Sequence, residues 1–278
     1  MKCFKTKLEL LSYLKSYRQK ESIGLVPTMG ALHSGHLQLI EASKRKCPIT
    51  ICSIFVNPMQ FNNTEDFENY PNTFDADLEK LQKLECDIVY APTINDLYVK
   101  GEKSKEFNFG SLSSGMEGKF RPGHFNGMAT IIEKLFNIIN PTKAFFGQKD
   151  LQQLQIVKAL VKQMDAPIEI VSIPTAREKN GLAKSSRNKR LSKSAKNDAT
   201  LIYNCLNYCL NNKGKEIVEL KLAIQNQFEK QKNLKLEYAK IVDLNTMLPI
   251  KEWQRENKNA ICIAAYIEGV RLIDNIIL

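Results

Sequence analysis

The sequence predicts an α/β protein, built from a doubly wound parallel sheet and a second, smaller α+β domain at the C-terminal end. Short apolar segments alternate with helical patterns between residues 23 and 173, and this alternation is typical of a parallel sheet joined by helices. The apolar segments are continuous, which indicates strands that are buried on both faces. After residue 173 the pattern changes, so we expect one domain over residues 1–173 and another over residues 174–278.

The first domain is expected to open with a helix. Thr6 and Glu9 form a capping-box pattern, and Leu8, Leu11 and Leu14 recur on one side of the helix that follows. Buried strands are then expected at residues 23–26, 49–56, 87–90, 143–146 and 168–173. Helices are expected from near His36 to residue 46 and at residues 73–84, 124–139 and 151–164.

The second domain begins with a polar, basic loop. Two helices are expected after it, at residues 193–211 and 215–230, and two β-like segments follow at residues 236–242 and 260–267. Because the strands here follow the helices instead of alternating with them, the pattern is typical of an α+β domain.

The composition is that of an ordinary globular protein, with 278 residues, 43% of them hydrophobic and 25% charged. No apolar segment approaches the roughly 20 residues of a membrane span, and the N-terminus lacks the apolar core of a signal peptide. We therefore expect a cytoplasmic protein without a membrane partner. The seven cysteines include no Cys-x-x-Cys pair, so packing is a better interpretation than disulfides or a zinc site.

The formal net charge of +10 raises the possibility of a basic RNA-binding module. Most of the positive residues are spread along the chain, and one cluster occurs at residues 184–196. RNA-binding modules usually place stacking aromatic residues among their basic residues. The cluster contains no aromatic residue, so we expect no nucleic-acid partner.

Two histidines follow the first buried strand, in the segment His33-Ser34-Gly35-His36, where a helix is expected to begin. Helix N-termini bind anions through unpaired N–H groups, and Gly35 leaves room for a nucleotide to approach. Two other interpretations remain open for these residues: surface histidines beside a helix cap, or a metal site with His124 as the third ligand.

Two further polar segments follow strands. Gly147-Gln148-Lys149-Asp150 lies between a strand and a helix, and its lysine is suited to phosphate binding. Residues 183–188 combine hydroxyls and cations that can bind a phosphate group in transfer. A solvated turn and a basic linker are the alternatives. Taken together, the three segments indicate an enzyme in which a carboxylate displaces pyrophosphate from ATP.

At these segments the chain resembles the pantothenate synthetase family nearly from end to end. The similar segments are residues 27–36, 55–61, 121–127, 145–150 with Gln152 and Gln153, 181–188 and 271–275. The resemblance implies that ATP and pantoate give pantoyl-adenylate and pyrophosphate, and that β-alanine then gives pantothenate and AMP. It also implies Mg²⁺, a Rossmann-like ATP- and pantoate-binding first domain, a C-terminal lid domain and a homodimer. A related nucleotidyltransferase, such as a cytidylyltransferase, is the nearest alternative.

The resemblance also assigns residues. It implies catalytic roles for His36, Lys149, Ser185 and Arg187 and pantoate binding by Gln60 and Gln153. The implied ATP-binding residues are Met29, Gly30, Ala31, Leu32, His33, Ser34, Gly35, His36, Gly147, Gln148, Lys149, Asp150, Ala176, Lys184, Ser185, Ser186 and Arg187. Tyr70 and Asp77 are weaker candidates near the β-alanine pocket, and no metal ligand is assigned.

The chain departs from the family at Lys184, which stands where an apolar residue is usual, and at residues 268–271, where a basic stretch is common. An exposed ion pair contributes only about 0–1 kcal/mol. We therefore expect the Lys184 side chain to point into water and not to add a phosphate contact.

Overall fold

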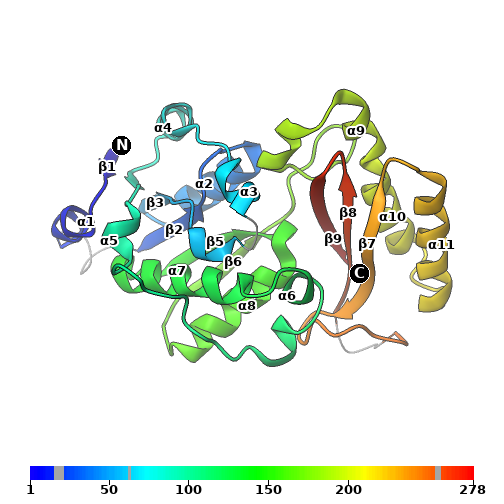
Figure 1. The fold of residues 1–278 in the computed structure, drawn as a ribbon. Helices are drawn as coiled ribbons and strands as arrows, with labels where there is room; N and C mark the ends of the chain where they lie inside the picture. The colour runs from blue at the N-terminus through cyan, green and yellow to red at the C-terminus, as the bar shows by residue number, and fades with distance from the viewer. Residues whose placement is uncertain (16–21, 62–63, 254–257) are drawn as a thin grey trace. The chain divides into compact units, whose positions relative to one another are not determined.

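Six parallel strands form the sheet of the first of two units into which the chain divides (Figure 1). The computed structural model describes residues 1–278 except 16–21, 62–63 and 254–257. The first unit comprises Met1–Phe109, Glu117–Gly147 and Gln153–Ile173. The second unit comprises Gly110–Met116, Gln148–Gln152 and Pro174–Leu278.

The strand order of the first sheet is β1-β4-β3-β2-β5-β6. The strands are β1 (Lys2–Phe4), β2 (Ile23–Thr28), β3 (Ile49–Ile54), β4 (Ile88–Tyr90), β5 (Lys143–Gly147) and β6 (Glu169–Ile173). The chain runs from β2 outward to β4 and then returns to place β5 on the other side of β2. This reversal makes the carboxyl ends of β2 and β5 the topological switch point, where open α/β sheets bind their ligands.

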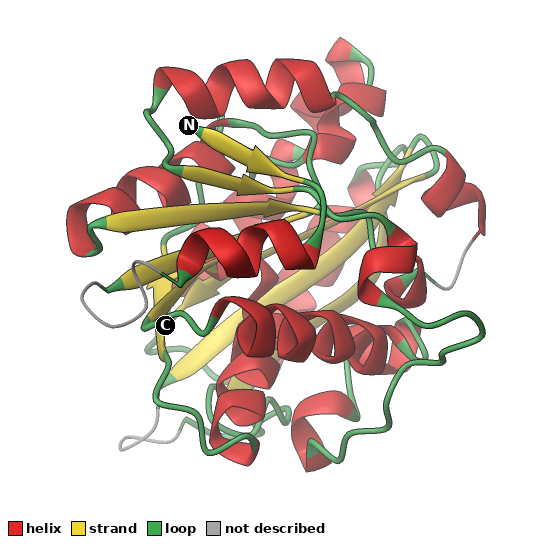
Figure 2. Cartoon of the chain, turned by 90° about the vertical axis from the view of Figure 1, so that its left-hand side faces the viewer, coloured by secondary structure: helices red, strands yellow, loops and turns green. Residues whose placement is uncertain are grey.

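Helices connect and cover these strands (Figure 2). The longer ones are α1 (Lys7–Leu14), α2 (Ser34–Lys46), α4 (Phe74–Lys83), α7 (His124–Ile139) and α8 (Leu151–Gln163). The shorter ones are α3 (Thr64–Glu68), α5 (Ile94–Leu97), α6 (Glu117–Phe120) and the 3₁₀ turn η1 (Pro58–Gln60). The 3₁₀ turns η2 (Gly110–Ser113) and η3 (Gln148–Asp150) belong to the second unit. The strand residues Leu25, Ile51 and Phe145 are fully buried, which confirms the prediction of an internal parallel sheet.

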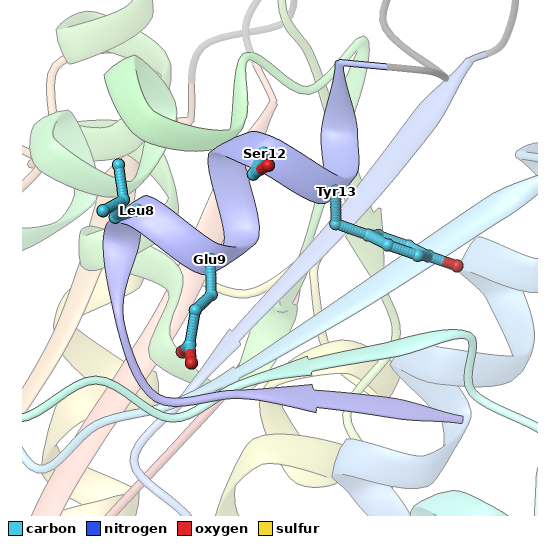
Figure 3. A pocket seen from close by; sticks show the side chains of 4 residues that line it. All are labelled: Leu8, Glu9, Ser12 and Tyr13. Atoms are coloured by element: carbon cyan, nitrogen blue, oxygen red, sulfur yellow. The ribbon is translucent and has the colours of Figure 1, made fainter.

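The first helix differs from the prediction in the face that it buries. Thr6 caps α1 as expected, because its hydroxyl accepts the N–H of Glu9 at 3.3 Å. Leu10 and Leu14 are the buried residues, however, and Leu8 is 79% exposed. At 3.6 residues per turn, Leu8 lies about 160° around the helix from Leu10. Leu8 therefore lines a shallow surface hollow together with Glu9, Ser12 and Tyr13 (Figure 3).

The second unit contains a three-stranded antiparallel sheet in the order β7-β8-β9. Its strands are β7 (Lys235–Asp243), β8 (Asn259–Ile267) and β9 (Val270–Ile277). Its helices are α9 (Lys193–Asp198), α10 (Thr200–Asn211) and α11 (Ile217–Lys230), preceded by the 3₁₀ turn η4 (Ser186–Arg190). Residues of α10 and α11 share one apolar core with β8 and β9, including Leu206, Leu220 and Ile263. The expected single helix over residues 193–211 is two helices that meet at Ala199.

The cysteines are packing residues, as predicted. All seven are free thiols, and all except Cys3 are buried. Burial raises the pKa of Cys205 to about 12 and that of Cys209 to about 11, so neither forms a reactive thiolate near neutral pH. Among the described residues, none of the helices has the length and apolar character that a membrane crossing requires.

Candidate active site

The loop after β2 turns sharply and then caps helix α2. Gly30 and Ala31 both have left-handed backbone angles, with φ of 78° and 50°. At Gly30, glycine suits the position through its conformation, and a Cβ there would make one tight contact, 3.2 Å from Ile54 Cγ2. The helix begins at Ser34, two residues earlier than predicted, and His33 is its N-cap.

Both histidines of this loop are fixed through Nδ1. His33 Nδ1 accepts the N–H of Gly35 at 3.1 Å, and His36 Nδ1 accepts the N–H of His33 at 3.3 Å. The two rings lie 4.1 Å apart at 30°. A neutral imidazole that accepts at Nδ1 carries its proton at Nε2. Each neutral ring therefore carries its proton at Nε2 and lies beside a helix N-terminus, a position that suits the binding of phosphate oxygens.

An ion pair of helix α4, with a buried carboxylate and a half-buried ammonium, holds the same loop. The Asp77 carboxylate accepts the N–H of Leu32 at 2.8 Å, and the Lys80 ammonium donates to the Leu32 carbonyl oxygen at 2.8 Å. The two side chains are 3.2 Å apart, and the Asp77 side chain is 1% exposed. The Thr73 hydroxyl donates to the other carboxylate oxygen of Asp77 at 3.1 Å. Asp77 is thus engaged with protein atoms, and its weaker assignment near the β-alanine pocket stays a prediction.

Gln60 lies at the end of η1 and is 8% exposed. Its side-chain amide donates to Met29 Sδ at 2.7 Å and accepts from Asn57 Nδ2 at 3.4 Å. Asn57 also contacts the Gly127 carbonyl oxygen at 3.0 Å and accepts the Tyr98 hydroxyl at 3.0 Å. The residues around Gln60 therefore fix its orientation.

His124 supports Gln60 and does not join the other two histidines. Its Nδ1 is 2.9 Å from the Gln60 carbonyl oxygen, and its Nε2 is 3.1 Å from Arg121 Nη1. Because a carbonyl only accepts and a guanidinium only donates, the neutral ring carries its proton at Nδ1. No three His, Cys, Asp or Glu side chains gather into a metal site within the described ranges. The metal interpretation of His33, His36 and His124 therefore has no support there.

The sequence did not assign roles to Asn57, Arg121 or Gly127, although all three belong to the motifs that it singled out. A Cβ at Gly127 would lie 2.0 Å from the Met59 carbonyl oxygen, so glycine permits α7 to approach η1. Gln152 is also structural, because its amide donates to the carbonyl oxygens of Leu112 and Gly115 at 2.8 and 2.9 Å. Gln153, the predicted pantoate ligand, is half-buried on α8.

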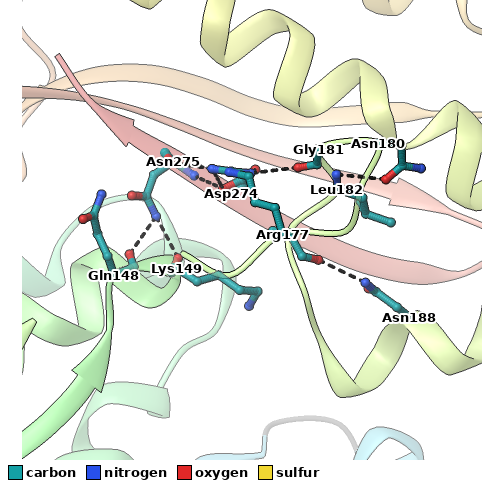
Figure 4. A network of polar contacts seen from close by, with 10 residues as sticks. Gln148, Lys149, Arg177, Asn180, Gly181, Leu182, Asn188, Asp274 and Asn275 are labelled. Carbon is teal, nitrogen blue, oxygen red and sulfur yellow. Dashed lines mark hydrogen bonds and ion pairs between the residues drawn. The ribbon is translucent and has the colours of Figure 1, made fainter. Parts of the chain in front are cut away.

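In the second unit, Lys149 belongs to η3, which follows β5 directly. Its ammonium lies 3.6 Å from the Asp150 carboxylate, and its side chain is 21% exposed. The carbonyl oxygens of Gln148 and Lys149 accept the side-chain amide of Asn275 at 3.0 and 2.8 Å (Figure 4). The backbone from which Lys149 projects is therefore held by the last strand of the chain.

The segment with hydroxyls and cations is the end of a hairpin. Arg177 and Ala183 pair as an antiparallel bridge, and the N–H of Lys184 donates to the Ala176 carbonyl oxygen at 2.9 Å. Ser185 caps η4 by accepting the N–H of Arg187 at 3.3 Å. Ser186 is buried, whereas Ser185 and Arg187 are half-buried.

Lys184 differs from the expectation that its side chain points into water. The ammonium lies 2.8 Å from the Glu178 carboxylate, across the same hairpin. The side chains of Lys184 and Glu178 are 26% and 42% exposed. An acidic neighbour six residues earlier is therefore the partner of this unusual lysine.

Comparison with known proteins gives one consistent result. A sequence model of the family described as pantoate-beta-alanine ligase matches residues 2–277. The pantothenate synthetase of Christiangramia forsetii is 45% identical, with 100% of this chain and 99% of that protein covered. That of Bacteroides thetaiotaomicron is 41% identical over 99% and 98% of the two chains.

Solved structures agree. The pantothenate synthetase of Thermus thermophilus has a TM-score of 0.92 and 36% identity, with 99% of each chain covered. The pantoate-beta-alanine ligase of Francisella tularensis, complexed with β-γ ATP and β-alanine, has a TM-score of 0.84 and 35% identity and covers 100% and 97% of the two chains. The match runs over the whole chain, which separates it from a cytidylyltransferase and from an RNA-binding module. This chain belongs to the pantoate-beta-alanine ligase family.

Proposed function

We propose that the chain condenses pantoate with β-alanine in two steps that share one enzyme-bound intermediate. The ligase activity itself follows from the family to which the chain belongs. In the first step a carboxylate oxygen of pantoate attacks the α-phosphorus of ATP. A new P–O bond forms, the bond to the β-phosphate bridge breaks, and pyrophosphate leaves. In the second step the β-alanine amine attacks the acyl carbon, an amide forms, and AMP and a proton are released.

The arrangement of His33 and His36 carries the proposal. Two Nε2–H donors beside a helix N-terminus can stabilise charge that develops on the phosphates of ATP. We assign this role to His36, and we assign further phosphate contacts to Lys149, Ser185 and Arg187. The other ATP ligands are proposed to be the residues of 29–36, 147–150 and 184–187 together with Ala176.

Gln60 and Gln153 are the proposed pantoate ligands. Support for Gln60 comes from its burial and from the hydrogen bonds that Asn57, His124 and Arg121 make to it or to its backbone. A side chain held in this way is preorganised to bond a hydroxyl or carboxylate of the acid. Sites of this kind reject analogues that lack the hydroxyl, because their own polar groups are left unpaired.

The test is product analysis with a panel of acids. We expect ATP, pantoate and β-alanine to give pantothenate, AMP and pyrophosphate in equal amounts. Pantoate without its 2-hydroxyl should react poorly, and equal kcat/KM for the two acids would remove Gln60 and Gln153 from the site. Formation of ADP and phosphate in place of AMP and pyrophosphate would contradict the adenylate route.

Three further expectations belong to the same proposal. We expect Mg²⁺ to enter as MgATP, because Mg²⁺ is usually held by substrate phosphates and one or two carboxylates. Omission of Mg²⁺ should therefore abolish turnover. A homodimer and a cytoplasmic location are expected from the resemblance and the sequence; light scattering and cell fractionation test them.

A further inference from the structure

Two consecutive residues of strand β9 contact both of the second-unit loops that carry proposed ATP ligands. Asp274 and Asn275 are 4% and 2% exposed. The partner of Asp274 is Arg177, 97 residues earlier, and the partners of Asn275 are the carbonyl groups 126 and 127 residues earlier (Figure 4). We call Arg177, Asp274 and Asn275 the β9 brace.

The Asp274 branch of the brace holds the hairpin that leads to Lys184. Arg177 Nη1 lies 2.5 Å from Asp274 Oδ2, and Arg177 Nη2 lies 3.1 Å from Asp274 Oδ1. The same Nη1 donates to the Gly181 carbonyl oxygen at 3.1 Å, and the guanidinium lies 4.2 Å above the Tyr203 ring. Because the planar Arg177 guanidinium is hydrogen-bonded to two partners and stacked on an aromatic ring, its orientation is fixed. The base of the hairpin at Arg177 and its turn at Gly181 are therefore fixed relative to β9.

The Asn275 branch holds η3. A 3₁₀ turn of three residues leaves carbonyl groups without partners of its own, and the Asn275 amide donates to those of Gln148 and Lys149. The other side-chain atom, Asn275 Oδ1, is buried without a hydrogen bond among the described residues. The Asn275 side chain therefore stabilises the structure through the two hydrogen bonds that its amide donates. Both are accepted by backbone carbonyl groups of η3, from which Lys149 projects.

The charges of the brace are expensive to bury. Burial raises the pKa of the Asp274 carboxyl, and the hydrogen bonds and charge of Arg177 oppose that rise. An apolar pair of similar volume is often at least as favourable for stability as a buried ion pair. Stability alone therefore does not explain why an Arg–Asp pair stands here, whereas a requirement for fixed loop geometry does.

We propose that Asp274, Asn275 and Arg177 are positioning residues for adenylation, which hold Lys149 and residues 184–187 in the geometry that the phosphates of ATP require. This inference rests on the proposed function. The polar side chains of these three residues contact protein atoms. In this proposal they affect the reaction only by holding η3 and the hairpin that leads to residues 184–187. A displacement of about 1 Å in such loops can lower a rate by about 10²-fold.

The test compares Arg177→Lys, Asn275→Ala and Asp274→Asn with a matched control. Glu237→Gln removes another ion pair of the same sheet, in which Arg271 Nη2 lies 2.6 Å from Glu237 Oε2 and the side chains are 17% and 12% exposed. The readouts are the melting temperature, the affinity for ATP alone by calorimetry, and kcat and pantoate KM in pyrophosphate exchange. Asp274→Asn leaves the half-buried Arg177 guanidinium without its anion and is the variant least sure to fold, so Arg177→Lys and Asn275→Ala decide the outcome.

We expect the brace variants to lower kcat about tenfold or more and to weaken ATP binding at least about threefold, with pantoate KM within about twofold. Glu237→Gln should lower the melting temperature comparably and leave kcat within about twofold of the wild type. Brace variants that match this control in both kcat and ATP affinity would overturn the inference. A wild-type protein that binds ATP but shows no pantoate-dependent exchange would refute the proposed function, and the ATP affinities would still test the brace.

Discussion

The loop after β2 and the loops of the second unit are held in place by different parts of the chain. Leu32 is clamped by Asp77 and Lys80, 45 and 48 residues away in the sequence. Lys149 and the hairpin after Arg177 are held from β9, about twice as far away or more. The first loop also caps its own helix through His33.

This difference affects what a substitution should do. The clamp on Leu32 lies within one sheet-and-helix layer, and the first loop keeps its own cap when the clamp is lost. The second-unit loops have local contacts as well, such as the Ser185 cap of η4, and Asp274 and Asn275 tie both of these loops to strand β9. We therefore expect function to be more sensitive to the β9 brace than to the Asp77–Lys80 clamp.

The largest loss of kcat is expected when a proposed phosphate ligand is replaced, either in the loop after β2 or in the loops of the second unit. Removal of one preorganised donor costs about 2.7–4 kcal/mol of transition-state stabilisation. His36→Ala and Lys149→Ala should each lower kcat for adenylation about 10²-fold or more while leaving the fold intact. Because His36→Ala also removes the acceptor of the His33 N–H, we expect a modestly lower melting temperature for that variant. Lys162→Ala, which removes an exposed lysine of α8, is the control. Near-normal kcat for His36→Ala would exclude it from catalysis.

A smaller effect is expected from the clamp. Lys80→Met removes the donor to the Leu32 carbonyl oxygen and leaves the Asp77 carboxylate buried without its cation. We expect a loss of about 1–3 kcal/mol in the free energy of unfolding and a kcat lowered by less than in His36→Ala. Lys83→Met, on the exposed face of the same helix, should change neither. A kcat loss in Lys80→Met larger than in the brace variants would reverse the comparison.

Lys184 should matter less, because its ammonium already has a partner. An ion pair as exposed as that of Lys184 and Glu178 contributes about 0–1 kcal/mol. Lys184→Met and Glu178→Gln should each change kcat/KM for ATP by less than about threefold. If Lys184 bound phosphate instead, Lys184→Met would lose about tenfold, and the loss would shrink as salt concentration rises.

The smallest effect concerns pH and involves neither the Asp77–Lys80 clamp nor the β9 brace. Ser192, the N-cap of α9, donates its hydroxyl and its N–H to the Glu268 carboxylate at 2.6 and 2.9 Å. These bonds lower the folded-state pKa of Glu268 below its usual value. The resulting stabilisation is complete above the unfolded-state pKa and is lost as pH falls through the folded-state pKa. Melting temperatures of wild type and Glu268→Gln should therefore converge as the solution is made acidic; a constant difference would rule this out.

Periodicity predicted five of the six parallel strands and missed β1, whose three residues, Lys2–Phe4, are too few and too exposed to give a pattern. It also missed β9. Arg271, Asp274 and Asn275 interrupt the apolar character of that strand, and the reason for two buried polar residues lies in loops about 100 residues away or more. The contacts of Asp77 could likewise not be predicted from the sequence, since a carboxylate in the first turn of a helix usually faces water.

Pyrophosphate exchange tests the central claim, an acyl-adenylate formed before the amine is bound, most directly. Labelled pyrophosphate is incubated with the protein, MgATP and pantoate in the absence of β-alanine. The two-step route predicts label in ATP under these conditions and none when pantoate is omitted. Exchange that strictly requires β-alanine would contradict it.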